Sequence, residues 1–267
     1  MKKLLFLILV SLFMPDHGSE LQAQPKFKEG FNQNKAIAHR GAWKNTGAPQ
    51  NSIASLKAAI ELGVAGSEFD IWLTADSILV INHDADHNGM IIEKTRYADL
   101  LKYPLKNGEP IPTLEQYISA GMKQRKTLLI AELKPSKVSK ERGLLAADIL
   151  METISRLGAE PWMVYISFDY DILKRIVQRD KTALTMYLNG DAEAVRLKGD
   201  GIYGANYQYR FFQQYEEWIA GAHRLGLAIS SWTVNDPEIM DALLAKNIDF
   251  ITTDEPELLF QRIAAGR

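Results

Sequence analysis

Residues 128–168 read LLIAELKPSKVSKERGLLAADILMETISRLGAEPWMVYISF and contain one complete strand–helix–strand unit. The unit starts with an apolar run at 128–133 and ends with a second one at 163–168. Between them, residues 140–156 carry apolar side chains at helical spacing. Two parallel strands need a crossover of about a dozen residues or more, usually a helix. The stretch therefore predicts a parallel α/β sheet.

The same alternation extends outward in both directions. We expect further strands at 36–39, 66–73, 78–82, 183–188, 201–205, 228–234 and 250–253. We expect further helices at 52–62, 113–123, 170–179, 191–197, 213–225 and 237–246. Asn51-Ser52 and Asp236-Pro237 are typical helix starts. Strand–helix pairs over about 250 residues favour a single (β/α)₈ TIM-like barrel. The alternative, a doubly wound open sheet, is not supported by any G-x-G-x-x-G turn.

This list holds nine strands, one more than an eight-stranded barrel needs. Residues 74–77 are too few for a crossover helix between the strands at 66–73 and 78–82. Either these two strands form a hairpin that rises from the barrel rim, or one barrel helix is missing. The polar stretch 85–112 is poorly periodic, and we expect it to be a small insertion over the barrel mouth. Residues 24–267 are expected to form one barrel domain.

The first 23 residues have the pattern of a secretory signal peptide. Two lysines precede an unbroken apolar run from Leu4 to Met14, and the small residue Ala23 suits cleavage before Gln24. A membrane-spanning helix needs about 20 apolar residues, which this run does not reach. We therefore expect export to the periplasm or beyond, with no stable membrane anchor; a retained anchor is the alternative. The chain has no cysteine and hence no disulfide framework.

The net charge argues against a nucleic-acid partner. The formal charge is −2, and no basic run is interleaved with aromatic residues. An anionic substrate must therefore be held by a few local cations.

Carboxylates lie near the ends of two expected strands. Glu68 and Asp70 are two residues apart, so both side chains face the same side of their strand. Glu132 and Lys134 have the same relation on another strand. In a (β/α)₈ barrel, residues at these strand ends face the active site. Three converging carboxylates would repel one another without a cation, and oxygen ligands favour Mg²⁺ or Ca²⁺.

Two histidines also lie at strand ends. His39 is followed by Arg40 and Gly41, which suits a catalytic group beside an anion clamp, because a guanidinium can bind two phosphate oxygens. His83 follows the strand at 78–82. The remaining histidines, His17, His87 and His223, are expected at the surface or in the leader.

Seven motifs follow one another between Ile37 and Pro256. They are H-R-G, P-x-N-S, E-x-D…T-x-D…H-D, E-x-K, S-F-D, W-T-V-N and T-D-E-P. The ordered set resembles the glycerophosphodiester phosphodiesterase family, and the likeness covers nearly the whole mature chain. It implies a metal-dependent barrel that cleaves a glycerophosphodiester, its small-molecule substrate, to glycerol phosphate and an alcohol.

The resemblance also implies a role for particular residues. The metal ligands would be Glu68, Asp70 and Glu132; the acid–base pair would be His39 and His83; and the phosphate would be held by Arg40 and Lys134. Trp232, in W-T-V-N, would either line the pocket or belong to the core. One position departs from the family pattern, because Gln50 stands where the family has glutamate. This change leaves cation affinity, substrate choice and rate open.

Three other functions are compatible with parts of this pattern. A glycoside hydrolase could use Glu68 and Glu132 as its carboxylate pair, but it would not need Arg40, Lys134 and two strand-end histidines. A related phosphodiesterase acting on phosphoinositides or lysophospholipids would share most of the site. A barrel that binds its ligand without catalysis is the third alternative, and intact His39 and His83 argue against it.

Overall fold

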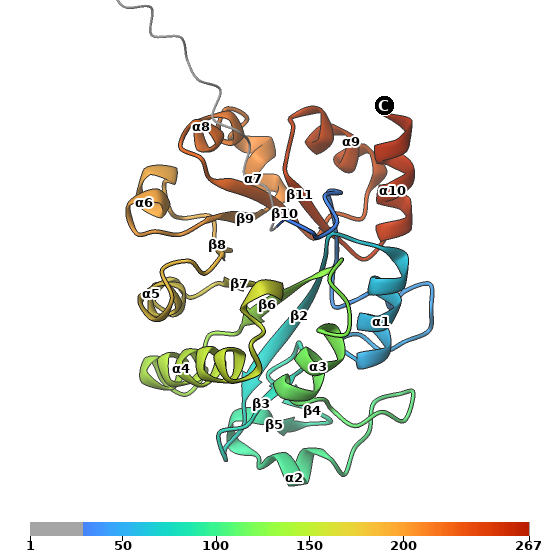
Figure 1. Cartoon of the computed structure of the whole chain (residues 1–267), viewed down its shortest axis with the longest axis vertical. Helices are drawn as coiled ribbons and strands as arrows, with labels where there is room; N and C mark the ends of the chain where they lie inside the picture. The colour runs from blue at the N-terminus through green and yellow to red at the C-terminus, as the bar shows by residue number, and fades with distance from the viewer. Residues whose placement is uncertain (1–28, 267) are drawn as a thin grey trace, which may run out of the picture.

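The computed structural model describes residues 29–266, in which eight parallel strands close into a barrel (Figure 1). In barrel order the strands are β1 (Ala36–Ala38), β2 (Gly66–Leu73), β6 (Leu128–Leu133), β7 (Met163–Ser167), β8 (Thr185–Tyr187), β9 (Gly204–Gln208), β10 (Ala228–Trp232) and β11 (Phe250–Thr253). The barrel closes because β1 pairs in parallel with both β2 and β11. The predicted (β/α)₈ barrel is confirmed, and the open sheet is excluded. The predicted export signal at 1–23 lies outside the described residues and stays a prediction.

The helices form an outer ring around the strands (Figure 1). They are α1 (Ile53–Leu62), α3 (Leu114–Gly121), α4 (Lys140–Leu157), α5 (Tyr170–Arg179), α6 (Ala194–Gly199), α7 (Tyr209–Gln214), α8 (Trp218–Arg224), α9 (Pro237–Ala245) and α10 (Pro256–Ala265). Ser52 and Asp236 cap α1 and α9, as predicted. The single helix expected at 213–225 is instead the two helices α7 and α8. No helix within residues 29–266 is both long enough and apolar enough to cross a membrane.

The ninth predicted strand forms a hairpin with β2. β3 (Leu79–Ile81) pairs antiparallel with the last residues of β2, with Ile71 opposite Ile81. The helix α3 then occupies the crossover position between β2 and β6. The hairpin alternative was therefore the correct one.

The insertion, residues 85–112, packs on this hairpin at the edge of the barrel next to β3 (Figure 1). It contains β4 (Asp86–His87), β5 (Met90–Ile91), a 3₁₀ turn (Ile92–Lys94) and α2 (Tyr97–Leu100). A small buried cluster joins it to β2 and β3; its members are Trp72, Val80, Ile92, Leu100 and Ile111. The insertion thus has an apolar base separate from the main core.

Alternation along β2 separates the core from the site. Phe69 points outward and packs on Tyr117 of α3, with ring centroids 4.5 Å apart. Gly66, Glu68 and Asp70 occupy the alternate positions, which face the barrel interior. A Cβ atom on Gly66 would lie 2.8 Å from the Ile130 side chain, so the glycine leaves room for an apolar floor. The carboxylates stand above this floor.

Candidate active site

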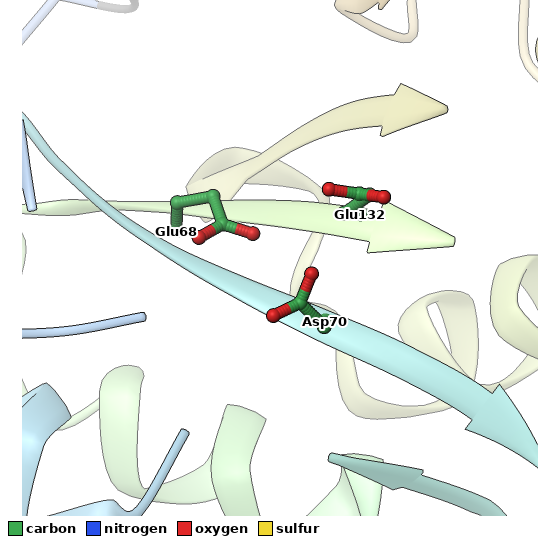
Figure 2. Close-up of side chains that lie close together, drawn as sticks. All are labelled: Glu68, Asp70 and Glu132. Atoms are coloured by element: carbon green, nitrogen blue, oxygen red, sulfur yellow. The ribbon is translucent and has the colours of Figure 1, made fainter. Parts of the chain in front are cut away.

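The three predicted carboxylates converge from two neighbouring strands. Glu68 and Asp70 lie on β2, and Glu132 lies on β6, where strand register places it directly beside Asp70. Figure 2 shows their carboxylates facing one another, and one oxygen from each lies within 4.8 Å of the others. All three residues are buried.

Two cations partly balance these carboxylates. Lys134 Nζ lies 2.7 Å from Asp70 Oδ1 and 2.6 Å from Glu132 Oε1, and Arg40 Nε lies 3.6 Å from Asp70 Oδ2. Three acidic and two basic side chains leave a formal excess of one negative charge. Among residues 29–266, Glu68 Oε1 is buried and finds no hydrogen-bond donor. A free buried oxygen and excess negative charge in an all-oxygen donor set fit Mg²⁺ or Ca²⁺.

Burial and mutual proximity shift the pKa values of the three carboxyl groups. Burial, together with the charges of Asp70 and Glu132, raises the pKa of Glu68 well above its usual value. Burial and the charge of Asp70 raise the pKa of Glu132 to about 7. Burial also acts to raise the pKa of Asp70, but Lys134, His83 and the hydrogen bond from Asn51 together outweigh it, and the pKa falls below its usual value. A bound cation would relieve the repulsion among these groups.

The raised pKa of Glu132 gives a testable pH dependence of stability. In a chelator, the free energy of unfolding should fall as the pH rises from about 4.5 to about 7, because folding favours the protonated Glu132 carboxyl. Below this window the carboxyl is protonated in both the folded and unfolded states. Thermal melting across the pH range measures the effect, and Glu132→Gln should be less sensitive to pH in the window. If the melting temperatures of the wild type and Glu132→Gln changed equally with pH, Glu132 would not be the cause.

A strained turn after β1 places Arg40 in the site. Arg40 has a φ of 57° and is followed by Gly41 with a φ of 82°. A Cβ atom on Gly41 would lie 2.5 Å from Ser55 Oγ, so only glycine lets the turn lie against α1. The Arg40 backbone N–H then donates to Glu68 Oε2 over 2.9 Å. The turn therefore links Arg40, the candidate for holding the phosphate, directly to the Glu68 carboxylate.

The P-x-N-S motif at the start of α1 supplies hydrogen bonds to the side chains of Arg40 and Asp70. Gln50 Oε1 accepts a hydrogen bond from Arg40 Nη1 over 2.6 Å. The buried Asn51 donates through Nδ2 to Asp70 Oδ2 over 2.8 Å and accepts from the Asp70 backbone N–H. Gln50 thus orients the guanidinium without adding the negative charge that glutamate would bring. Asn51 was predicted only as part of a helix start, not as a partner of Asp70.

His39 is oriented by a chain of polar groups from the last two barrel strands. Its Nδ1 lies 2.7 Å from Asp254 Oδ1, and Asn235 Nδ2 donates to Asp254 Oδ2 over 2.7 Å. Burial acts to raise the pKa of Asp254, but His39, the hydrogen bond from Asn235 and the charge of Arg40 together outweigh it and the pKa is lowered. With Nδ1 engaged, Nε2 is the ring nitrogen left to act. Asp254 and Asn235 were not predicted as site residues, although they lie in the motifs T-D-E-P and W-T-V-N.

His83 lies on the loop that follows β3. Its backbone oxygen accepts a hydrogen bond from Trp72 Nε1 over 3.1 Å, and its Nδ1 lies 2.8 Å from Asp84 Oδ1. Burial is the main cause that lowers its pKa, aided by the charges of Lys134 and Arg40. A lowered pKa favours the neutral imidazole, which can accept a proton.

One cavity of 140 Å³ brings the predicted residues together. His39, Arg40, Glu68, His83, Glu132, Lys134 and Trp232 all line it. Asp70 does not line the cavity itself, but it forms an ion pair with the lining residue Lys134. Ile166, Phe168 and Leu188 form the facing apolar wall. Trp232 donates to the Asn206 backbone oxygen over 2.8 Å and packs edge-on against Phe168, so it is both a wall of the cavity and part of the packing.

Comparison with known proteins agrees with this geometry. The model of the glycerophosphoryl diester phosphodiesterase family matches residues 39–258. A glycerophosphodiester phosphodiesterase from Caldanaerobacter subterraneus is 29% identical over 249 residues, which span 86% of this chain and 98% of that protein. A crystal structure of a glycerophosphodiester phosphodiesterase from Parabacteroides distasonis superposes with a TM-score of 0.85 at 38% identity, covering 89% of this chain and all of that one.

A further structure, an Oleispira antarctica phosphodiesterase in complex with the product sn-glycerol-3-phosphate, has a TM-score of 0.72 at 26% identity and covers 87% of this chain and 97% of that chain. The family resemblance expected from the seven motifs is therefore confirmed. With a family match from the first catalytic candidate, His39, to beyond Asp254, the chain belongs to the glycerophosphoryl diester phosphodiesterase family, the enzymes of which are phosphoric diester hydrolases.

Proposed function

We propose that this enzyme uses a divalent cation, Mg²⁺ or Ca²⁺, and the pair His39 and His83 to cleave glycerophosphodiesters to glycerol phosphate and an alcohol. The observation that carries the proposal is a cluster of three carboxylates beside one cavity, which two cations and two imidazoles also line. The product bound to the Oleispira relative supports glycerol phosphate as the product here.

Glu68, Asp70 and Glu132 would hold the cation. When bound, the cation supplies Lewis-acid stabilisation of the anionic phosphate, which is worth several kcal/mol in the transition state. Arg40 and Lys134 line the cavity next to these carboxylates and bind the remaining phosphate oxygens. Ile166, Phe168 and Leu188 form an apolar part of the same cavity lining.

The two histidines move the protons. One imidazole removes a proton from the attacking oxygen, which belongs to water or to the neighbouring glycerol hydroxyl. The other donates a proton to the oxygen of the leaving alcohol. Each such transfer typically contributes about 10²–10⁴ in rate. Asp254 holds one of the two rings, His39, in a single orientation while it acts.

Hydrolysis of glycerophosphocholine with and without a cation tests the proposal. We expect release of glycerol phosphate with Mg²⁺ or Ca²⁺, loss of activity in EDTA, and recovery when the cation is restored in excess. The assay follows glycerol phosphate by an enzyme-coupled reaction.

The same assay separates the alternatives. Turnover of a phosphoinositide or lysophospholipid but of no soluble glycerophosphodiester would favour the related phosphodiesterase. Tight binding without turnover of any diester would identify a ligand-binding barrel. Full activity after complete cation removal would contradict the cation's role.

A further inference from the structure

A second, larger hollow adjoins the catalytic cavity. This groove, of 680 Å³, runs between the loop from β1 to α1 and the insertion. Trp43, Pro49 and Gln50 form one wall, while Tyr103, Leu105 and Lys106 form the other. No residue of the catalytic set lies in it, and the mechanism above does not use it.

Gln50 connects the groove to the chemistry. It lines the groove, and its Oε1 accepts the 2.6 Å hydrogen bond from Arg40 Nη1. Arg40 in turn lines the catalytic cavity. A substrate whose phosphate lies on Arg40 can therefore extend past Gln50 into the groove.

The groove has more room than the catalytic cavity. Its volume is 680 Å³, against 140 Å³ for the cavity. The alcohol half of a glycerophosphodiester can therefore extend from the cavity into the larger hollow.

The charges of the groove select the kind of alcohol. Its lining includes Lys44, Lys106 and His87 but no carboxylate. Lys44 is already paired with Glu255, whereas Lys106, which also lines the groove, has no ion-pair partner within residues 29–266. Aromatic rings such as Trp43 and the half-exposed Tyr103 can attract a quaternary ammonium group. Here, however, the unpaired Lys106 ammonium would repel that charge.

We propose that this groove binds the leaving alcohol and favours a polyhydroxy alcohol, such as inositol, over choline. The inference rests on the proposed hydrolysis of glycerophosphodiesters. The Lys106 ammonium offers hydrogen-bond donors to the hydroxyl groups. The rings of Trp43 and Tyr103 pack against the apolar C–H faces of the polyol. The groove thus sets the alcohol preference, while the catalytic cavity holds the glycerol phosphate half.

Steady-state kinetics of the whole enzyme with Mg²⁺ test this assignment. We expect kcat/KM to be at least about tenfold higher for glycerophosphoinositol than for glycerophosphocholine. Lys106→Glu should lower kcat/KM for glycerophosphoinositol about tenfold, mainly through KM. It should leave the methyl ester of glycerol phosphate unaffected, because a methyl group does not reach the groove.

Lys94→Glu is the matched control. Lys94 is an exposed lysine of the same insertion and does not line the groove, so its variant should keep the wild-type preference. Preference for glycerophosphocholine in the wild type, or equal behaviour of the two lysine variants, would overturn the groove assignment alone. Hydrolysis of no diester at all would overturn the proposed function instead.

Discussion

Replacement of His39 or His83 by alanine is expected to lower kcat for a glycerophosphodiester at least about a hundredfold. Each imidazole moves one proton in the proposed reaction, and no other described histidine lines the catalytic cavity. Both rings are partly exposed, so their removal opens no large void in the core. Initial rates with saturating Mg²⁺ measure the effect, and thermal melting verifies that the variants fold.

A third histidine provides the control for this pair. His223 lies on α8, away from the cavity, and its Nε2 lies 2.9 Å from Asp249 Oδ2. Glutamine can replace that hydrogen bond, so His223→Gln should retain wild-type kcat. Near-normal turnover in both His39→Ala and His83→Ala would rule out the acid–base scheme.

Glu68→Gln is expected to abolish cation binding as well as catalysis. At a concentration of 100 times its Kd, a bound cation stabilises the folded state by about 2.7 kcal/mol. For a protein of this size, that raises Tm by roughly 5–10 °C. The variant keeps the shape of the side chain but removes a ligand charge. Its Tm should therefore respond little to Mg²⁺ or Ca²⁺, and kcat should fall at least about a hundredfold.

Differential scanning calorimetry, with and without each cation, measures this response independently of activity. Glu115→Gln is the matched control, because Glu115 is a surface carboxylate of α3 paired with Arg156. Its variant should show the same cation-dependent rise in Tm as the wild type. If the cation raised the Tm of Glu68→Gln as much as that of the wild type, the cation would have to bind elsewhere.

Local patterns predicted the barrel well where each strand and helix is long and regular. The strand β2 and the helix α4 illustrate this, because β2 is buried along its whole length and α4 has one apolar face. The final helix, α10, was missed although Pro256 in its first turn is a typical start. The break between α7 and α8 was also missed. The apolar spacing in residues 213–225 suits one continuous helix, but the helical backbone is interrupted there.

The individual site residues were predicted from the sequence, but the contacts between them were not. Two-residue spacing on a strand placed Glu68 beside Asp70, and the strand ends located His39. The register that sets Glu132 opposite Asp70 arises from sheet pairing, which no local pattern specifies. In the same way, Asp254 is 215 positions from His39 in the sequence, and only barrel closure brings them together. Residues that orient a functional group are therefore harder to predict than the group itself.

The β2–β3 hairpin has a consequence for how this enzyme could diversify. The candidate cation ligands lie on the barrel strands β2 and β6, whereas His83 and one wall of the groove lie on the hairpin and the segment that follows it. Exchange of loop tips beyond Asn88 would alter which alcohols are accepted without touching the scaffold that holds the phosphate. In the proposed scheme, new head-group preferences can arise by exchange of the segment beyond Asn88 alone, while His83 and the barrel residues stay in place.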